Sequence, residues 1–567
     1  MNQTSDLAEA TKRWIAGDPD PVTRGELQRL LDDENWEELG ERMGGVLEFG
    51  TAGIRGAVEG GSNRMNRAVV IRTTAGLAQF LADRGEGPVV VGFDGRHSSR
   101  TFAEDTIGVL IAAGREVRFF PEPVPTPMVA FAARRLGAVA AVVVTASHNP
   151  PADNGYKVYD RNAAQIVPPV DSAIAAAIEA APPAVDVPRV ENAMAGADGA
   201  SPLDFDEIYE DYRSEVETVR PRRTGSSLTV AYTPIHGVGW RVFERLAIDA
   251  GYHNVHVVDE QRDPDGDFPT VNFPNPEEPG AMDLVMELGD RIEADLVIAN
   301  DPDADRLAVA IPSSEGWRLL TGNQIGVLMA DWLLERWNGE GVPLVINSIV
   351  SSPMLAEVAR LHGARFEQTL TGFKWIANAA LDLEAAGEGR FVFGYEEALG
   401  YTVGPVVRDK DGLSAALVFM DMAAELAEAG SSVSERLEDL YRRAGLWVST
   451  QLSVVRPGTE GQAEIEGAME RIGRTQPPEL AGNRVVGSTD YRRGAEDRPR
   501  WLPETPLVAL DLEGGGRVLV RPSGTEPKLK IYVDLPGEAG SDYSQAEKEL
   551  TDQAERIAAA TAGFIGL

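Results

Sequence analysis

The stretch "GAVAAVVVTASHNP" (residues 137–150) joins a run of small and apolar residues to a short polar segment. The apolar run has no polar alternation, which is typical of a strand buried on both faces of a sheet in an α/β domain. The polar segment places Ser147 just beyond the end of that strand. Two interpretations stay open from these residues alone: a turn that ends the strand, or a loop that presents a nucleophilic serine.

The chain on either side of this stretch alternates between strands and helices. The segment 88–93, "PVVVGF", is expected to be a buried strand, 101–114 a helix and 115–122 a further strand. This alternation predicts a layered α/β domain. The pattern restarts near residue 227 and again near residue 320, whereas the block from about residue 441 predicts an α+β domain.

The length of 567 residues is too great for one hydrophobic core, so several domains are expected. The segment 181–204 is rich in Pro, Ala, Gly and Asp, which predicts a linker or a long surface loop. We predict four domains with the boundaries 1–204, 205–316, 317–440 and 441–567.

The composition is that of an ordinary globular protein, with 43% hydrophobic and 25% charged residues. The net charge of −36 would repel nucleic acid and anionic lipid, so neither is an expected partner. No apolar stretch is long enough to span a bilayer and no signal-peptide pattern is seen, so we expect a cytoplasmic enzyme. The absence of cysteine excludes disulfides, thiolate catalysis and Cys-bound metal.

Lysine is rare in this chain, with seven residues against 46 arginines. Five of the seven fall inside glycine-containing motifs, and these are Lys157, Lys374, Lys410, Lys528 and Lys530. This clustering indicates local positive sites for an anionic ligand.

The loop "NDPDADR" (300–306) follows an apolar strand and carries Asp301, Asp303 and Asp305. A locally extended backbone would project all three carboxylates to one side, and a hard cation such as Mg²⁺ would relieve their repulsion. A calcium EF-hand is excluded, because Arg306 and Pro312 stand where that loop needs Gly and Glu. A solvated acidic loop and a nucleophilic Asp301 that forms an aspartyl phosphate remain as alternatives.

The segment "RPSGTEPKLKIY" (521–532) combines cations, hydroxyls and a glycine between two strand-like runs. Such groups can surround a phosphate with charge-assisted and backbone hydrogen bonds. The residues expected to do so are Arg521, Ser523, Gly524, Thr525 and Lys530. An ordinary hairpin turn is the alternative.

Three further loops carry single groups of interest. They are "LEFGTAGIRG" (47–56) with Arg55, "TLTGFKWI" (369–376) with Lys374, and "GYEEALGY" (394–401) with Glu396 and Glu397. The two glutamates could accept hydrogen bonds from sugar hydroxyls, but a surface turn explains them as well. His236 is expected to be a loop histidine with an ordinary partner.

Taken together, six stretches resemble the α-D-phosphohexomutase superfamily, whose members include phosphoglucomutase and phosphomannomutase. In chain order they are "FGTAGIRG", "TASHNP", "NDPDADR", "TGFKW", "GYEEALGY" and "RPSGTEPKLKIY", and they span Phe49 to Tyr532. The resemblance implies four domains around a central cleft: three similar mixed α/β domains and a C-terminal α+β domain. In order, these would hold the phosphoserine loop, the metal loop, the sugar-recognition loop and the phosphate-binding loop.

The same resemblance implies a role for each predicted site residue. Ser147 would carry a phosphoryl group, with Lys157 and Arg55 as further catalytic residues. One Mg²⁺ would be bound by Asp301, Asp303, Asp305 and an oxygen of the phosphorylated Ser147. Arg306, Gly372, Lys374, Glu396 and Glu397 would bind substrate, and the five residues named in 521–532 would hold the phosphate that does not react.

The implied enzyme is an isomerase, an intramolecular phosphotransferase that interconverts a sugar 1-phosphate and 6-phosphate through a sugar bisphosphate. Glucose is the first expectation and mannose the second. Many hexose mutases have Glu-x-Ser in the sugar loop, whereas Ala398 stands here, so a phosphopentomutase acting on ribose or deoxyribose 1- and 5-phosphates is the alternative. A phosphatase with an Asp301 nucleophile and a non-catalytic sugar-phosphate binder are more distant alternatives. The expected assembly is a monomer or a homodimer.

Overall fold

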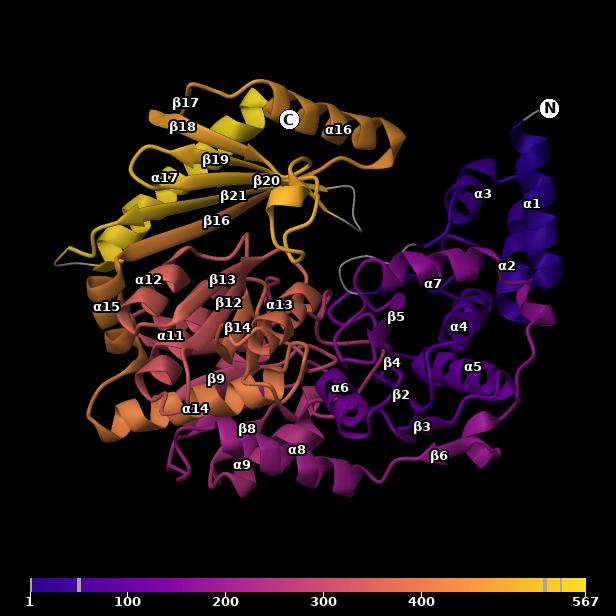
Figure 1. Ribbon diagram of the computed structural model, residues 1–567, viewed down its shortest axis with the longest axis horizontal. Coiled ribbons are helices and arrows are strands. Elements are labelled where there is room, and N and C mark those ends of the chain that lie inside the picture. Colours follow the sequence, from indigo (N-terminus) through magenta and orange to yellow (C-terminus); the bar gives the residue numbers. More distant parts are fainter. Residues whose placement is uncertain (1–2, 48–52, 524–527, 541–542) are drawn as a thin grey trace. The chain divides into compact units, whose positions relative to one another are not determined.

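The structure is a computed structural model that describes residues 3–47, 53–523, 528–540 and 543–567, apart from the side chains of 458–460. The chain divides into two compact units (Figure 1). The first comprises Met1–Leu319 with Pro405–Val418, and the second Leu320–Gly404 with Phe419–Leu567. Helix α14 (Gly412–Glu428) begins in the first unit and ends in the second.

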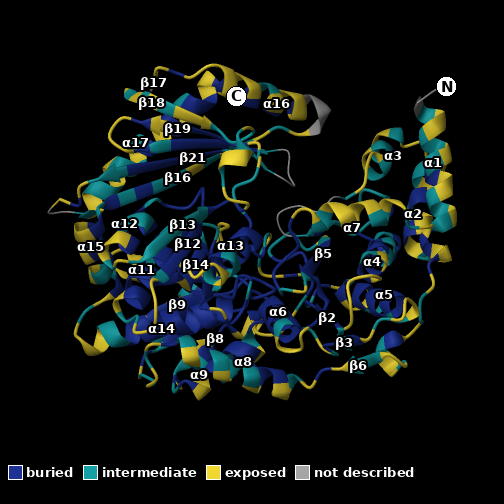
Figure 2. Cartoon of the chain, viewed as in Figure 1, coloured by how far each residue is buried: buried dark blue, intermediate teal, exposed yellow. Residues whose placement is uncertain are grey.

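The first sheet of the first unit has the strand order β1-β5-β4-β2-β3-β6. Strands β4, β2, β3 and β6 are parallel, whereas β5 runs antiparallel to both β4 and β1. The strands are β1 (Ile54–Ala57), β2 (Val89–Phe93), β3 (Val117–Phe119), β4 (Ala140–Val144), β5 (Asp153–Asp160) and β6 (Ala200–Pro202). Every residue of β2 and β4 is buried, as their apolar sequences predict (Figure 2).

Helices cover this sheet, with α4 packed against α5 and α7, and α6 packed against β2 and β4. The predicted helix 101–114 is α5, which begins two residues earlier. The helices are α1 (Gln3–Gly17), α2 (Pro21–Asp32), α3 (Trp36–Met43), α4 (Arg67–Leu81), α5 (Ser99–Ala112), α6 (Thr126–Arg135) and α7 (Val170–Glu179), with short 3₁₀ turns η1 (Ala184–Asp186) and η2 (Ala193–Ala195).

The segment 181–204, predicted to be a linker or a long surface loop, contributes one edge strand to the first sheet. It holds β6, which pairs in parallel with β3, and the Val190 amide donates to the Gly108 carbonyl at 3.0 Å. Its Pro and Gly residues prevent a long helix, but they leave room for a short edge strand.

The second sheet of the first unit has the order β11-β10-β9-β7-β8, with β7, β8 and β9 parallel and β10 and β11 antiparallel. Its strands are β7 (Val230–Thr233), β8 (Val255–Val257), β9 (Leu296–Ala299), β10 (Ala308–Ser313) and β11 (Gly316–Leu319). The accompanying helices are α8 (Phe205–Val219), α9 (Trp240–Asp249) and α10 (Asp283–Ile292), with the 3₁₀ turn η3 (Asp259–Gln261).

The second unit begins with a four-stranded sheet in the order β13-β12-β14-β15, where only β15 is antiparallel to its neighbour. The strands are β12 (Pro343–Ser348), β13 (Arg365–Thr369), β14 (Arg390–Glu396) and β15 (Gly400–Val403). Its helices are α11 (Gly322–Glu335), α12 (Met354–Leu361), α13 (Phe373–Ala385) and α15 (Val433–Ala444). A capping box between Thr321 and Gln324 fixes the start of α11.

The last sheet is antiparallel throughout, in the order β16-β21-β20-β19-β18-β17, and it confirms the predicted α+β character of the C-terminal block. The strands are β16 (Leu446–Val455), β17 (Glu479–Leu480), β18 (Asn483–Asp490), β19 (Val508–Leu512), β20 (Arg517–Pro522) and β21 (Lys528–Gly537). The helices are α16 (Gly458–Arg474) and α17 (Tyr543–Phe564), with the 3₁₀ turn η4 (Ala495–Asp497).

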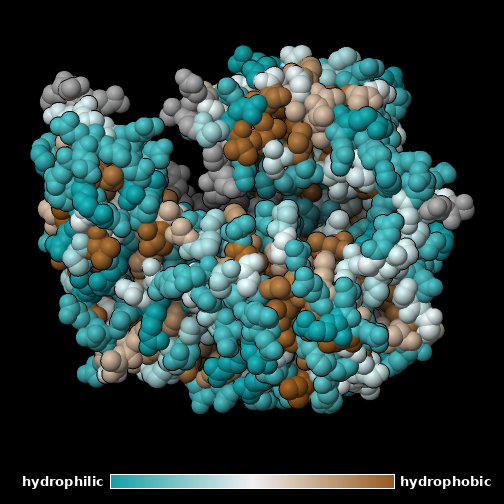
Figure 3. Space-filling view, turned by 180° about the vertical axis from the view of Figure 1, so that it is seen from behind, coloured by the Kyte–Doolittle hydropathy of each residue, from teal (hydrophilic) through white to brown (hydrophobic). Residues whose placement is uncertain are grey.

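Hydrophilic residues cover most of the face seen in Figure 3, as the acidic composition leads one to expect. Inside the second unit, however, the fully buried carboxylate of Asp331 has several cationic partners. Asp331 on α11 is contacted by the Nε2 atom of His362 at 2.7 Å, by Arg436 Nη2 at 2.5 Å and by Arg443 Nη2 at 2.7 Å. The Asp331 carboxylate thus joins α11 to α12 and α15.

We expect Asp331→Asn to destabilise the second unit by about 3 kcal/mol at neutral pH, because two arginines lose a buried counterion. Burial alone would raise the pKa of Asp331, but the Arg443 and His362 contacts lower it below its ordinary value. This stabilisation is therefore present above about pH 4 and is lost as the pH falls through the lowered pKa. Urea unfolding followed by circular dichroism should show the mutant and wild type converging in acid.

The matched control is Asp439→Asn, which removes an exposed carboxylate 2.7 Å from Nε of the same Arg443. A surface pair of this kind contributes less than about 1 kcal/mol. Equal losses of stability in the two variants would contradict the role given to Asp331.

Candidate active site

The loop after β4 holds its serine in a strained conformation. Ser147 has a φ of +53°, in the left-handed region that side chains other than glycine rarely adopt, and it is 1% exposed. Its amide donates to Thr145 Oγ1 at 2.8 Å. A non-glycine residue held in this way is a frequent feature of functional loops.

Arg96 fixes the shape of this loop, and the sequence analysis missed it. The Nη2 atom donates to the Ser147 and Asn149 carbonyls at 2.8 and 2.6 Å, and Nη1 donates to the Pro150 and Asp153 carbonyls at 2.7 and 2.9 Å. Arg96 is only 4% exposed. It lies just beyond β2, the parallel neighbour of β4, so the sheet brings it to the loop from a distant part of the sequence.

The second loop follows β9, and its three carboxylates converge by a turn. The Ala304 amide donates to the Asp301 carbonyl at 2.8 Å, and Ala304 has a φ of +56°. The expectation of a locally extended backbone is therefore wrong, although the expected clustering is present. Asp301, Asp303 and Asp305 are fully buried, and one ligand atom from each lies within 4.8 Å of the others.

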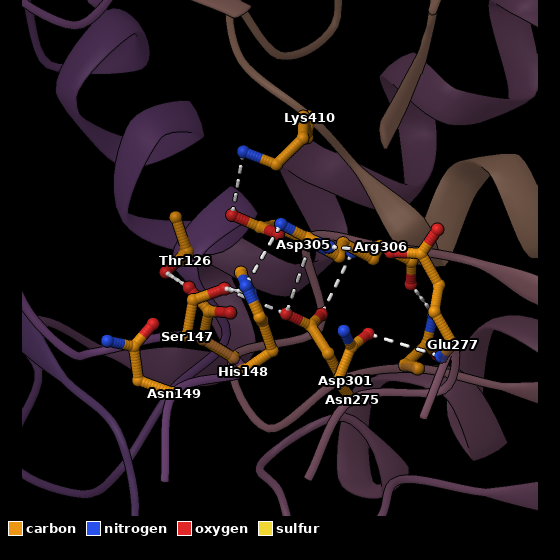
Figure 4. A network of polar contacts seen from close by, with 12 residues as sticks. Thr126, Ser147, His148, Asn149, Asn275, Glu277, Asp301, Asp305, Arg306 and Lys410 are labelled. Carbon is orange, nitrogen blue, oxygen red and sulfur yellow. Dashed lines mark hydrogen bonds and ion pairs between the residues drawn. The ribbon is translucent and has the colours of Figure 1, made fainter. Parts of the chain in front are cut away.

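The two loops meet at the serine hydroxyl (Figure 4). Ser147 Oγ donates to Asp301 Oδ2 at 2.9 Å, and it also lies 3.1 Å from Nδ1 of His148. The hydroxyl of Ser147 thus has two polar neighbours, a carboxylate and the imidazole of the next residue. Burial, with Arg306 and Arg55 nearby, lowers the pKa of His148 well below its ordinary value, so the ring is neutral.

Lys157 on β5 is fully buried and bridges two of the carboxylates. Its Nζ atom donates to Asp303 Oδ2 at 2.7 Å and to Asp305 Oδ2 at 2.9 Å. Burial alone would lower the pKa of Lys157, but the two carboxylates raise it above its ordinary value. Burial and the neighbouring carboxylates raise the pKa of Asp301 well above its usual range.

Thr126 and Lys410 complete the surroundings of the carboxylates. Thr126 was not predicted, whereas Lys410 is one of the five lysines expected to mark positive sites for an anionic ligand. Thr126, the first residue of α6, donates its hydroxyl to Asp303 Oδ2 at 2.6 Å and its amide to the Asp303 carbonyl at 3.0 Å. The Lys410 Nζ atom lies 3.1 Å from Asp305 Oδ2. The scarcity of lysine was a signal for Lys410, whereas no local pattern pointed to Thr126.

Two arginines approach from other elements. Arg55 on β1 donates from Nη1 to Asn149 Oδ1 at 3.2 Å, and burial lowers its pKa. The Arg306 amide donates to Asp301 Oδ1 at 3.0 Å, while its Nη2 lies 3.5 Å from His148 Nε2. The first unit therefore brings Arg55, Ser147, Lys157, the three aspartates and Arg306 together.

The carboxylate cluster fits a hard divalent cation. Among the residues that the structure describes, Asp303 Oδ1 and Asp305 Oδ1 are buried and find no hydrogen-bond partner, which is costly for an ionised oxygen. An all-oxygen donor set of this kind suits Mg²⁺ better than a soft transition metal.

The predicted sugar-recognition residues lie in the second unit. The Gly372 amide donates to Glu396 Oε1 at 2.7 Å, which brings the two predicted loops together. The Glu397 Oε2 atom accepts hydrogen bonds from the hydroxyls of Ser348 and Ser351, both at 3.1 Å. Its carboxylate is thus engaged by its own domain, which the sequence did not reveal. Lys374 is 9% exposed and lies 6.0 Å from the centre of the Trp375 ring.

The predicted phosphate-binding residues also belong to the second unit. Arg521 on β20 and Lys530 on β21 are direct cross-strand partners, so their side chains share one face of the sheet. The Ser523 amide donates to the Lys528 carbonyl at 2.8 Å. Gly524 and Thr525 lie outside the described residues.

His236 lies apart from this group, and its Nε2 atom is 2.8 Å from Thr270 Oγ1. It is therefore a loop histidine with an ordinary partner, as expected. Throughout the ranges that the structure describes, none of the helices has the length and apolar character of a membrane span.

Family models match most of the chain. The model described as "Phosphoglucomutase/phosphomannomutase, alpha/beta/alpha domain I" matches residues 46–184, and those for domains II and III match 206–314 and 321–444. The model for the C-terminal domain of the same family matches residues 493–560.

Several curated proteins align over nearly their whole length. A Haemophilus influenzae protein named "Probable phosphomannomutase" is 39% identical over 87% of this chain and 97% of its own. The Saccharomyces cerevisiae phosphoribomutase is 35% identical over 94% and 93%. A Staphylococcus epidermidis phosphoglucomutase is 34% identical over 92% and 96%.

Solved structures share the fold. A phosphoglucomutase/phosphomannomutase family protein from Burkholderia thailandensis has a TM-score of 0.64 at 20% identity, over 90% of this chain and 97% of its own. The Paramecium phosphoglucomutase parafusin has a TM-score of 0.67 at 18% identity, over 92% and 96%. With four family domains in order and relatives aligned end to end, the chain belongs to the phosphoglucomutase/phosphomannomutase family of phosphomutases, which are isomerases.

Proposed function

We propose that the protein moves a phosphoryl group between the 1-position and the terminal position of an aldose, through a phosphoserine at Ser147 and a bound sugar bisphosphate. The observation that carries this proposal is the surroundings of the Ser147 hydroxyl. Its Oγ lies 2.9 Å from Asp301 in a buried cluster that gathers three carboxylates with Lys157 and Lys410. His148 lies beside the hydroxyl as a base would in a hydrolase, but the same hydroxyl also faces carboxylates and ammonium groups suited to a transferring phosphoryl.

In the proposed reaction, the free hydroxyl of a sugar monophosphate loses its proton to a base and attacks the phosphorus of phosphorylated Ser147, so that the bond to Oγ breaks and a bound sugar bisphosphate forms. The Ser147 Oγ atom then bonds to the phosphorus of the other phosphate as its bond to the sugar oxygen breaks, and that oxygen takes up the proton. Arg55 and Arg306 are close enough to the serine loop to bind phosphoryl oxygens. Mg²⁺, when bound by Asp301, Asp303 and Asp305, would supply positive charge to the same oxygens. The near-complete burial of Ser147 supports the exclusion of water, which would otherwise hydrolyse the phosphoserine.

The main proposed role of Lys157 is to supply a positive charge, and proton donation is its second role. Its ammonium donates to both Asp303 and Asp305, and its pKa is raised, so it holds its proton while these carboxylates lack another counterion. We infer that Lys157 becomes available for proton transfer only when a cation shares the carboxylates. Arg55 remains charged throughout and is proposed to orient the phosphoryl group.

The residues of the second unit are proposed to hold the rest of the substrate. Gly372, Lys374 and Glu396 would contact the sugar, and Arg521, Ser523, Gly524, Thr525 and Lys530 would bind the phosphate that does not react. The cross-strand pair Arg521 and Lys530 supports the second assignment, because two cations on one face suit a dianion.

The identity of the sugar depends on the loop "GYEEALGY". Ala398 offers no hydroxyl, and the Glu397 carboxylate is engaged by Ser348 and Ser351. A sugar loop that offers fewer hydrogen-bonding groups suits a pentose, which has fewer hydroxyls than a hexose. The Saccharomyces cerevisiae phosphoribomutase aligns over nearly the whole chain. We therefore rank ribose and deoxyribose ahead of glucose and mannose, the reverse of the order expected from the sequence.

We expect the resting protein to carry one phosphoryl group. Ser147→Ala should remove this group and lower mutase activity by on the order of 10³-fold or more. Intact-mass measurement and a coupled mutase assay with Mg²⁺ and a sugar bisphosphate test this. A phosphoserine survives hydroxylamine, whereas an aspartyl phosphate on Asp301 is cleaved by it. Ser172→Ala, at an exposed serine, is the matched control and should change neither readout. Phosphate that persists in Ser147→Ala would refute the serine assignment.

We expect kcat/KM for ribose 1-phosphate to exceed that for glucose 1-phosphate. Ala398→Ser adds a hydroxyl donor and should raise the glucose-to-ribose ratio about fivefold, as one hydrogen bond of about 1 kcal/mol allows. Steady-state kinetics with ribose, deoxyribose, glucose, mannose and N-acetylglucosamine phosphates measure both effects. Ala386→Ser, at an exposed position of the same unit, should leave the ratio unchanged. A clear preference for glucose in the wild type would restore the first expectation, and no turnover of any sugar would overturn the proposed function.

A further inference from the structure

Residues 405–411, here called the strap, bind tightly to the rest of the first unit. The Asp409 Oδ2 atom accepts hydrogen bonds from the Tyr159 hydroxyl and from Gln165 Nε2, both at 2.6 Å. Asp411 accepts from the Tyr212 hydroxyl at 2.8 Å and from Ser414 Oγ at 2.6 Å. The strap is therefore held by a buried carboxylate on each side of Lys410.

Lys410 is the residue between these two anchors. Its amide donates to Asp409 Oδ1 at 2.8 Å, and its Nζ atom lies 3.1 Å from Asp305 Oδ2 and 3.8 Å from Asp409 Oδ1. Figure 4 shows the Lys410 ammonium directed at the Asp305 carboxylate. The direction of this side chain thus depends on where the strap is held.

Strand β5 links the strap to the carboxylate cluster. Lys157 and Tyr159 are two residues apart on β5, so their side chains share one face of the sheet. Lys157 contacts Asp303 and Asp305, and Tyr159 contacts Asp409. One face of β5 therefore places the Lys157 ammonium in the carboxylate cluster. Through Tyr159, the same face fixes the strap that carries the Lys410 ammonium.

The Tyr159–Asp409 hydrogen bond is shielded from water. Tyr159 is fully buried and Asp409 is 1% exposed, so water does not compete for the hydrogen bond. Burial and the Asp409 carboxylate raise the pKa of Tyr159 well above its ordinary value, which keeps the hydroxyl protonated and able to donate. Hydrogen bonds to a charged acceptor are the stronger kind.

The position of Lys410 matters because an ammonium and a divalent cation compete for the same carboxylate. Lys157 and Lys410 both contact Asp305 Oδ2. A positive charge held there lowers the affinity of the cluster for a cation, yet it also adds charge that opposes the negative phosphoryl group in the transition state.

We propose that Tyr159 is a positioning residue: by holding Asp409 it fixes the Lys410 ammonium on Asp305 and so sets the divalent-cation affinity of the aspartate cluster. The catalytic consequence rests on the proposed function, but the cation affinity does not. Tyr159 itself touches neither the carboxylate cluster nor the serine loop by any contact described above.

The test measures Mg²⁺ binding to the full-length protein by isothermal titration calorimetry, with no substrate present. We expect Lys410→Met to lower the Mg²⁺ Kd about tenfold, because a positive charge leaves the cluster. Tyr159→Phe keeps the net charge and the ring, and it should lower the Kd about threefold in the same direction, because Lys410 is no longer fixed. In the mutase assay, both variants should show a fold-decrease in kcat that is larger than the fold-change in KM.

The combined variant separates positioning from a general structural effect. If Tyr159 acts through Lys410, adding Tyr159→Phe to Lys410→Met leaves the Kd unchanged, whereas independent effects would add. The matched control is Tyr209→Phe, which removes the same type of hydrogen bond, 2.6 Å to Asp249, elsewhere in the first unit. This control should not alter the Mg²⁺ Kd.

An unchanged Mg²⁺ Kd in a folded Tyr159→Phe, or additive effects in the combined variant, would overturn the proposal. If Tyr159→Phe does not fold, Gln165→Met removes the other donor to Asp409 and gives the same test. A resting protein without phosphate on Ser147 would refute the proposed function and still leave the Mg²⁺ measurement decisive for Tyr159.

Discussion

Three carboxylates within 4.8 Å of one another, all fully buried, impose the constraint around which the first unit is built. Charges of one sign in a low-dielectric interior are tolerated only with counterions and hydrogen bonds. These come from separate parts of the chain: Lys157 from β5, Thr126 from the start of α6 and Lys410 from the strap. The strand orders of the two sheets in this unit place these groups next to the carboxylates. A cation would take over part of the same task.

Much of this could be predicted from the sequence, because the informative residues lie in short loops next to apolar strands. The buried strand before Ser147 and the aspartates after β9 are both local patterns. Arg96, Thr126 and the contact of Lys410 with Asp305 escaped prediction because only tertiary structure brings these groups together. The turn at Ala304 was predicted wrongly because it depends on a left-handed backbone at a residue other than glycine, which no pattern of residue types reveals.

In the sugar loop, the residue types alone do not show which partner each side chain contacts. Two adjacent glutamates indicate two acceptors for a substrate, but backbone geometry points Glu397 at Ser348 and Ser351 within its own domain. Glu396, one residue earlier, instead accepts from the amide of Gly372. Glu396 is the last residue of β14 and Glu397 lies just beyond it, so two identical neighbours take different partners. The residue types alone do not show which partner each carboxylate has.

The strap has a consequence for how the protein is made. Residues 405–418 belong to the first unit, although the chain leaves that unit at Leu319 and builds a whole four-stranded sheet before it returns. During translation the first unit therefore emerges incomplete. The strap partners of Tyr159, Tyr212 and Asp305 are synthesised 250, 199 and 105 residues later. A fragment that stops at Leu319 would leave these polar groups buried without their partners, so neither unit corresponds to a single uninterrupted stretch of the gene.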